Sequence, residues 1–195
     1  MQRVLLFIDR LNAFIGRSFA WCILALTFVM SFEVFSRYLF AAPTKWAFDA
    51  SYMLYGTLFM MAGAYTLSRN AHVRGDFLYR TWSPRVQAWL DLVLYILFFF
   101  PGITAMVIAG GLEAERSWAL DERTNSPATV PIAPFKTIIP LVGVLMLLQG
   151  FVEVIRCVQC IRTGVWPQRL RDVEELEKQL IEARVAGIDA TGEGP

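Results

Sequence analysis

The sequence is poor in the side chains that most metalloproteins and redox proteins use. It has one histidine, His72, and three cysteines, Cys22, Cys157 and Cys160. One histidine cannot supply two imidazole ligands to a transmembrane haem within a single chain. Cys157 and Cys160 form a lone C-x-x-C, whereas a structural zinc site needs about four ligands. We therefore expect no cofactor, no metal ion and no catalytic site in this chain.

Charged residues are also scarce. They make up 18% of the chain, whereas hydrophobic residues make up 56% and the mean hydropathy is +0.47. Soluble proteins carry roughly 25% charged residues. The formal net charge of +1 provides no basic surface for nucleic acid. This composition predicts an all-α integral membrane protein that is not an enzyme.

Four long runs contain no Asp, Glu, Lys or Arg, and these runs locate the membrane spans. A helix needs about 20 mostly apolar residues to cross about 30 Å of hydrocarbon. With their flanks, the runs predict four transmembrane helices, over about residues 11–36, 46–68, 86–112 and 135–157. We expect residues 1–165 to form the transmembrane domain. Residues 166–195 are expected to form a cytoplasmic tail, first a short amphipathic helix and then a disordered end.

Basic residues in the short connections predict the topology, because cytoplasmic loops carry an excess of Lys and Arg. One side of the membrane collects eleven: Arg3, Arg10, Arg17, Arg69, Arg74, Arg80, Arg85, Arg156, Arg162, Arg169 and Arg171. The other side collects five: Arg37, Lys45, Arg116, Arg123 and Lys136. We therefore predict that both termini are cytoplasmic and that the first helix serves as its own insertion signal.

Local signals predict where the helices begin and end. We expect the first helix to begin near Asp9 and Thr44 to cap the second. Ser83, which precedes a proline, is expected to cap the third. Pro101 predicts a kink within the third helix. The outer loop that follows is expected to span residues 113–134.

Ionisable side chains near the hydrocarbon are costly to bury and usually pair. Glu33 and Arg37 lie four residues apart on one face of the first helix, and Asp49 lies on the same side of the membrane. We expect Arg37 to bridge Asp49 or Glu33 and so to hold the first hairpin together. A proton or ion relay is the alternative, but it requires carboxylates across the membrane, and the middles of the spans have none.

Small residues predict packing surfaces in the second helix. Gly56 and the pair Gly63–Ala64 let helices approach closely where lipid gives no hydrophobic drive. Trp46 suits the membrane interface, where its amphipathic ring sits at headgroup depth. We expect this glycine face and the first hairpin to contact a partner subunit.

A series of short motifs lies at the predicted helix ends. They are E-V-F-S-R-Y-L-F at 33–40, Pro43, Trp46, G-A-Y at 63–65, H-V-R-G-D at 72–76, S-W at 117–118, P-F-K at 134–136, Pro140 and Q-G at 149–150. Together, from about Arg10 to Arg162, they resemble the small, DctQ-like membrane subunit of tripartite ATP-independent periplasmic (TRAP) transporters. The outer-loop motifs are most similar to the mannitol/chloroaromatic-type branch. Asp49 stands where the family usually has Glu, and Gly75 where a branched apolar residue is common.

The resemblance implies a supporting role in transport. In such systems a periplasmic binding protein delivers an organic acid to a large membrane subunit, which imports it with a sodium gradient while the small subunit packs beside it as a scaffold. It also implies a bacterial inner membrane, with lipid as a further partner and any sodium site on the large subunit. From the residue patterns and the resemblance together, the candidate structural or subunit-interface residues are Glu33, Arg37, Trp46, Asp49, Gly56, Gly63, His72, Asp76, Trp118, Lys136 and Gln149.

Two other classes of protein remain open. An autonomous four-helix transporter of the small multidrug type needs a carboxylate in the middle of its first helix, and residues 20–31 have none. A membrane anchor of a redox complex needs haem or quinone ligands, and the lone His72 counts against it.

Overall fold

The computed structural model describes residues 2–69, 79, 81–169, 172 and 179. Its helices are α1 (Gln2–Ala20), α2 (Cys22–Leu39), α3 (Ala47–Ser68), α5 (Pro84–Leu94), the π-helix η1 (Tyr95–Phe99), α6 (Phe100–Ala119) and α7 (Ala133–Thr163). No strand forms within the described residues, which confirms the predicted all-α class.

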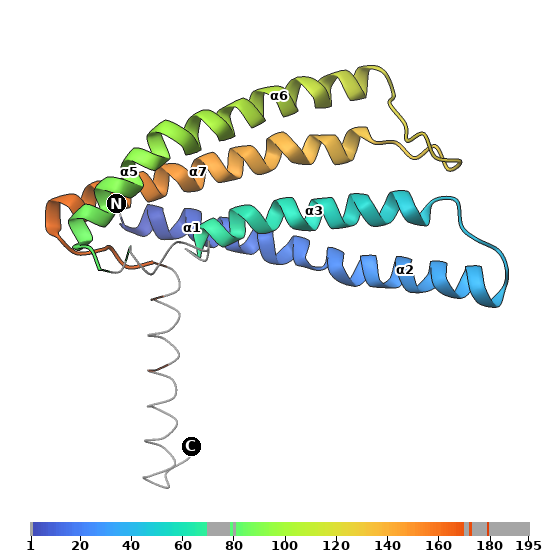
Figure 1. The fold of residues 1–195 in the computed structure, drawn as a ribbon, viewed down its shortest axis with the longest axis horizontal. Helices are drawn as coiled ribbons and strands as arrows, with labels where there is room; N and C mark the ends of the chain where they lie inside the picture. The colour runs from blue at the N-terminus through green and yellow to red at the C-terminus, as the bar shows by residue number, and fades with distance from the viewer. Residues whose placement is uncertain (1, 70–78, 80, 170–171, 173–178, 180–195) are drawn as a thin grey trace, which may run out of the picture.

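The helices lie side by side as long rods (Figure 1). α1 and α2 follow one another in one broken rod, and α3 runs back beside it. α5, η1 and α6 form the next rod, which runs towards connection 120–132, and α7 runs back beside that rod. α3 contacts α1, α2 and α7, while α7 also contacts α1, α5 and α6. We call the end where α1 begins and α7 ends the tail end. The opposite end, with connections 40–46 and 120–132, is the hairpin end.

Three segments are long and apolar enough to cross a membrane: Gln2–Leu39, Pro84–Ala119 and Ala133–Thr163. Large apolar side chains point outward from them, including Trp21, Phe28 and Phe98, each at least 70% exposed. Such a surface suits lipid rather than water. α3 has 22 residues and carries polar side chains among the apolar ones; it is not one of these three segments. The chain is therefore a multi-pass membrane protein.

The first rod begins earlier than predicted and is interrupted. α1 starts at Gln2, so Asp9 lies inside the helix and is buried rather than marking its start. A turn at Trp21 separates α1 from α2. Just before this turn, the Ser18 hydroxyl donates to the Phe14 carbonyl at 3.0 Å. A bond of this kind, back to the preceding turn, often bends a helix.

The third rod contains a π-helix close to the position of the predicted kink. η1 (Tyr95–Phe99) lies just before Pro101. Proline gives no N–H, and its ring clashes with the carbonyl four residues earlier, so the wider π-turn relieves that contact. At the start of the rod, Ser83 occupies the N-cap position before Pro84, as predicted, although its side chain makes no capping hydrogen bond.

The predicted outer loop is too long at both of its ends. α6 continues to Ala119, so Glu113 and Trp118 are helical, and α7 begins at Ala133. The connection is therefore 120–132 rather than 113–134. Helix formation continues past the apolar run because Ala, Glu and Arg are good helix formers and because Ala114 remains buried.

A glycine ends α7. Gly164 has a φ of 79°, and its N–H donates to the Cys160 carbonyl at 2.7 Å, the left-handed ending that glycine favours. The chain then turns back, because the Trp166 indole N–H donates to the Gln87 side-chain oxygen on α5 at 3.2 Å. The predicted amphipathic helix of the tail lies outside the described residues.

Two apolar clusters pack the middle of the bundle. One joins α3 to α7 through Met61, Ala64, Val142 and Leu145. The other joins α5 and η1 to α7 through Ala88, Tyr95, Cys157 and Cys160. Neither cysteine of the C-x-x-C forms a disulfide and both are buried, so the pair contributes to packing.

Candidate functional site

A buried polar group lies at the tail end, between α1 and α7. This tail-end cluster consists of Asp9 and Asn12 of α1, Gln149, Glu153 and Arg156 of α7, and Arg169 beyond α7, none more than 8% exposed. The spacing explains its position, because residues three or four apart share a helix face. Each helix therefore turns a polar stripe towards the other.

Arg156 lies at the centre of the tail-end cluster. Its Nη2 is 2.5 Å from Oδ2 of Asp9, and its Nη1 donates to Oε1 of Glu153 at 2.7 Å. The second oxygen of Glu153 is 3.0 Å from Nη2 of Arg169. One chain of ion pairs thus connects α1, α7 and the segment after α7.

Amide groups extend these contacts along the helices. The Gln149 side chain donates to Oδ1 of Asp9 at 2.8 Å and accepts from the Asn12 side chain at 2.8 Å. Two carboxylates face two guanidinium groups, so the formal charges cancel. This balance matters because an unpaired charge buried away from water costs several kcal/mol.

Of this cluster, only Gln149 is among the candidate residues from the sequence. Asp9 is assigned there only to a helix start. The available signal is the spacing of polar positions inside apolar segments: 149, 153 and 156 on one helix, and 9 and 12 on another. Two such polar stripes in one membrane domain are expected to face each other, because each then keeps its polar groups away from lipid.

Glu33 organises the first hairpin. Its Oε1 accepts from Nε of Arg37 at 2.9 Å, and its Oε2 accepts from the Thr44 N–H at 2.9 Å and from the Thr44 hydroxyl. Thr44 does not cap the next helix, contrary to the prediction from the sequence, because that helix begins three residues further along; the Thr44 N–H and hydroxyl both donate to Glu33. α3 instead begins at Ala47, with Trp46 in the N-cap position.

Asp49 does not pair with Arg37. It is 2% exposed, and its Oδ2 accepts from the Thr124 hydroxyl at 3.0 Å and from the Ser126 hydroxyl. Asp49 therefore ties the start of α3 to connection 120–132. Of the two bridges considered for Arg37, the structure forms the one to Glu33.

Lys136 makes a third tie at the hairpin end. Its Nζ is 2.7 Å from Oε1 of Glu113 and 2.6 Å from Oε2 of Glu122. The hydrogen bond from Lys136 holds the pKa of the Glu122 carboxyl below its usual value. The Trp118 indole N–H also donates to the Thr137 hydroxyl at 2.9 Å, so α6 and α7 are joined at this end by charge and by hydrogen bonding.

The glycine face of α3 serves packing within the chain. A Cβ at Gly56 would lie 2.7 Å from Cζ of Phe135 on α7, and Ala64 belongs to the core shared with α7. The nearest such neighbour of Gly63 is Met146, also on α7. This face is therefore not the open partner surface that the sequence suggested.

Three candidate residues from the sequence remain: Trp46, His72 and Asp76. Trp46 is 42% exposed, and its ring stacks on Phe32 with centroids 6.3 Å apart. His72 and Asp76 lie outside the described residues.

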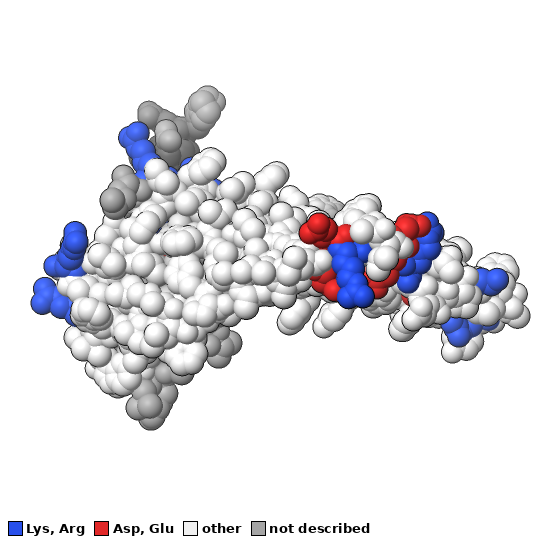
Figure 2. All heavy atoms as spheres, turned by 90° about the horizontal axis from the view of Figure 1, so that it is seen from above, with Lys and Arg blue, Asp and Glu red and all other residues white. Residues whose placement is uncertain are grey.

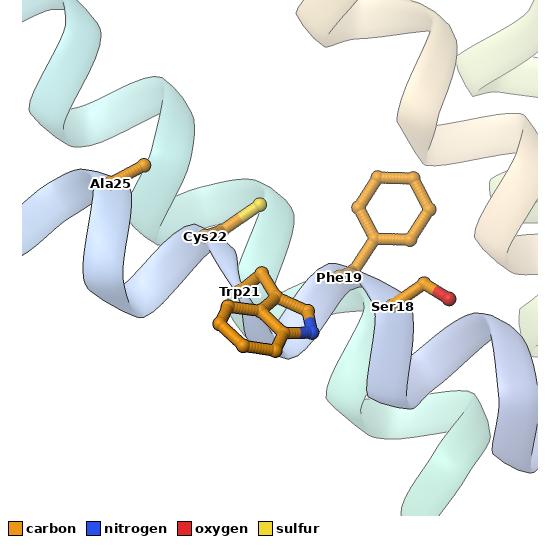
Figure 3. A pocket seen from close by; sticks show the side chains of 5 residues that line it. All are labelled: Ser18, Phe19, Trp21, Cys22 and Ala25. Atoms are coloured by element: carbon orange, nitrogen blue, oxygen red, sulfur yellow. The ribbon is translucent and has the colours of Figure 1, made fainter.

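Charge is segregated on the surface. Figure 2 shows a broad uncharged band between the basic side chains of the tail end and the charged group nearer the hairpin end. A hollow of about 370 Å³ lies beside the α1–α2 break, lined by Ser18, Phe19, Trp21, Cys22 and Ala25 (Figure 3). These side chains are uncharged, so the hollow offers no ion pair to an anionic solute.

Fold and site together define a multi-pass helical membrane protein whose buried charged side chains are bonded to other groups of the same chain at both ends of the bundle. A scan against protein families matches residues 3–160 to the family described as tripartite ATP-independent periplasmic transporters, DctQ component. The match covers most of the chain, and the protein belongs to this family of small TRAP transporter subunits. It is thus a component of a transporter. A search of curated proteins finds no match.

Proposed function

We propose that this chain is the stationary scaffold of a sodium-driven importer in a bacterial inner membrane. A periplasmic binding protein delivers an organic acid, a carboxylate or similar anion, to a large membrane subunit that moves it inward. The small subunit keeps the large subunit in place during that movement. The motifs of the hairpin end favour the mannitol/chloroaromatic-type branch, whose name does not determine the substrate.

The pairing of buried charges is the observation that carries this proposal. A site for a charged solute keeps polar groups directed at the solute. Here Arg156 is directed at Asp9 and Glu153, and Glu33 at Arg37 and Thr44. The Arg156 contacts fix α1 against α7, and the Glu33 contacts fix connection 40–46 against α2. An elevator-like motion requires one part that stays still in the bilayer, and helices joined at both ends suit that part.

Four crossings and two cytoplasmic termini complete the proposed topology. α3 has 22 residues and is therefore about 33 Å long, enough to cross the hydrocarbon. It lies between α1–α2 and α7, so we infer that it crosses with them. The excess of basic residues near the tail end supports a cytoplasmic location for that end.

The first hairpin is the proposed contact with the large subunit. Tyr38 and Phe40 are 77% and 75% exposed there, beside the turn that Glu33 fixes. Aromatic side chains on a fixed turn provide contact area at little entropic cost. The glycine face of α3 is not included, because α7 already covers it.

Uptake into vesicles tests the proposal. Membrane vesicles would contain this chain alone, the large subunit alone, or both, each with binding protein and an inward sodium gradient. We expect uptake of an organic acid only when both subunits are present. Uptake by this chain alone would overturn the scaffold proposal in favour of an autonomous transporter. A haem absorbance band in the purified chain would instead favour a redox anchor.

A further inference from the structure

A second concave surface lies between α1 and α3, towards the tail end. This α1–α3 groove has a volume of about 210 Å³ and is lined by Gly16, Arg17, Ala20, Leu58, Ala62 and Tyr65. Ala20 and Ala62 are exposed, so the groove opens on the outer surface of the bundle. Its two walls meet closely, because a Cβ at Gly16 would lie 2.6 Å from Cβ of Tyr65.

The groove extends along α3 away from the tail end. Tyr65 lies about one turn before α3 ends at Ser68, and Leu58 lies two turns further from that end. Seven helical residues span about 10 Å. On the proposed topology, in which α3 crosses the membrane, the Tyr65 end of the groove is at the depth of lipid headgroups and the Leu58 end is at the depth of acyl chains.

Arg17 is the only charged residue among those that line the groove. Its Nε donates to the Ala13 carbonyl at 3.3 Å, and no acidic side chain in the described part of the chain pairs with it. Arg3 and Arg10 precede it at seven-residue steps, which place all three on one face of α1. The guanidinium of Arg69 lies over the Tyr65 ring, 5.6 Å from its centroid. Two guanidinium groups, those of Arg17 and Arg69, thus lie at the tail-facing end of the groove.

We propose that the α1–α3 groove binds one anionic phospholipid of the surrounding membrane. The phosphate is held by Arg17, whose planar guanidinium matches two phosphate oxygens. One acyl chain lies along Ala20, Leu58 and Ala62. An anionic headgroup is favoured over a zwitterionic one because the described part of the groove has no carboxylate to receive a headgroup ammonium. The lipid fills the seam between α1 and α3 just before the α1–α2 break.

Native mass spectrometry of the full-length chain tests this site. The probes are phosphatidylglycerol and phosphatidylcholine with identical acyl chains, added to the chain in mild detergent. We expect retention of phosphatidylglycerol to exceed that of phosphatidylcholine by about fivefold for one basic contact. Arg17→Gln should abolish this preference. The matched control is Arg162→Gln, because Arg162 is also exposed at the tail end but lies on α7. It should leave the preference unchanged.

A second variant tests the apolar part of the groove without changing any charge. Ala62→Leu fills the space beside Leu58 and should reduce retention of both lipids. Ala105→Leu, on an exposed position of α6, should not. Equal retention of both lipids by the native chain, or an unchanged preference in Arg17→Gln, would overturn the proposal. Displacement of phosphatidylglycerol by excess glycerol 3-phosphate would also overturn it, since the acyl chain would then contribute nothing.

The large subunit is the other conceivable occupant of the groove. Retention of phosphatidylglycerol is therefore also measured on the complex of both subunits. We expect the lipid to remain bound. Its loss on assembly, together with failure of Ala62→Leu to co-purify with the large subunit, would assign the groove to the protein interface instead. This result would overturn the lipid site and leave the scaffold proposal intact.

Discussion

Arg156 of α7 pairs with Asp9 of α1 at 2.5 Å, and both side chains are at most 1% exposed. The two residues lie 147 positions apart in the chain, so this ion pair joins the first and the last membrane segments. Lipid tails are as apolar as leucine, so little hydrophobic drive holds such helices together. A directional pair fixes which faces of α1 and α7 meet.

Asp9→Asn should destabilise the protein strongly. The substitution keeps the shape of the side chain but leaves the guanidinium groups of Arg156 and Arg169 with one carboxylate, Glu153. Removing one partner of a buried pair typically costs about 3–5 kcal/mol. We expect a loss of that order in the free energy of unfolding, measured by denaturant titration in detergent micelles.

Asp121→Asn is the matched control, because it removes the same charge from an exposed pair. Asp121 lies 3.0 Å from Arg123, and their side chains are 75% and 48% exposed. Exposed pairs contribute about 0–1 kcal/mol. Equal losses in the two variants would show that burial of the pair is not what stabilises the tail end.

The sequence predicted the membrane class and the approximate positions of the helices, because long uncharged runs depend only on local composition. It did not predict the tail-end cluster. The pairing of Asp9 with Arg156 depends on α1 lying beside α7, and chain order does not reveal that neighbourhood. The prediction that Thr44 caps the second helix is a related error, because a capping pattern considers only the residues that directly follow Thr44 in the chain. In the structure α3 begins only at Ala47, and the Thr44 N–H donates back to Glu33, eleven residues earlier.

Two adjacent glycines of α6 provide a test of helix packing. A Cβ at Gly110 would lie 2.8 Å from Cγ2 of Ile139 on α7, whereas a Cβ at Gly111 would meet nothing within 4 Å. Ile139 is β-branched, so its side chain has few other rotamers with which to avoid the added methyl group. We expect Gly110→Ala to lower the free energy of unfolding by about 1–3 kcal/mol through overpacking.

Gly111→Ala should instead stabilise the protein slightly, by up to about 1 kcal/mol from helix propensity. Denaturant titration of the two variants side by side measures the contrast. The same response in both would mean that α6 and α7 are not in close contact at Gly110.

Glu122 predicts a dependence of stability on pH at the hairpin end. The hydrogen bond from Lys136 lowers its pKa below 4.5. The folded state therefore binds this proton less tightly than the unfolded state does. The stabilising contribution is complete above pH 4.5 and is lost as the pH falls through the folded-state pKa.

We accordingly expect the native chain to be more stable than Glu122→Gln at neutral pH, and this difference to shrink as the pH falls below 4.5. Thermal unfolding across that range measures it. Glu115→Gln, at an exposed glutamate of α6, serves as the control for general charge effects. A difference that grows on acidification would contradict the assigned interaction with Lys136.

Arg37→Ala tests the first hairpin as the contact with the large subunit. The substitution leaves Glu33 bonded only to Thr44, so the turn at 40–46 is held less firmly, and it also removes a guanidinium whose side chain is 54% exposed. We expect a clear loss of co-purified large subunit, with the sodium concentration for half-maximal uptake unchanged in the complex that remains. Arg123→Ala removes an exposed charge from the other hairpin-end connection and should leave assembly intact. Undiminished co-purification of Arg37→Ala would place the contact elsewhere. A shifted sodium requirement with normal assembly would mean that Arg37 acts in ion coupling rather than in holding the subunits together.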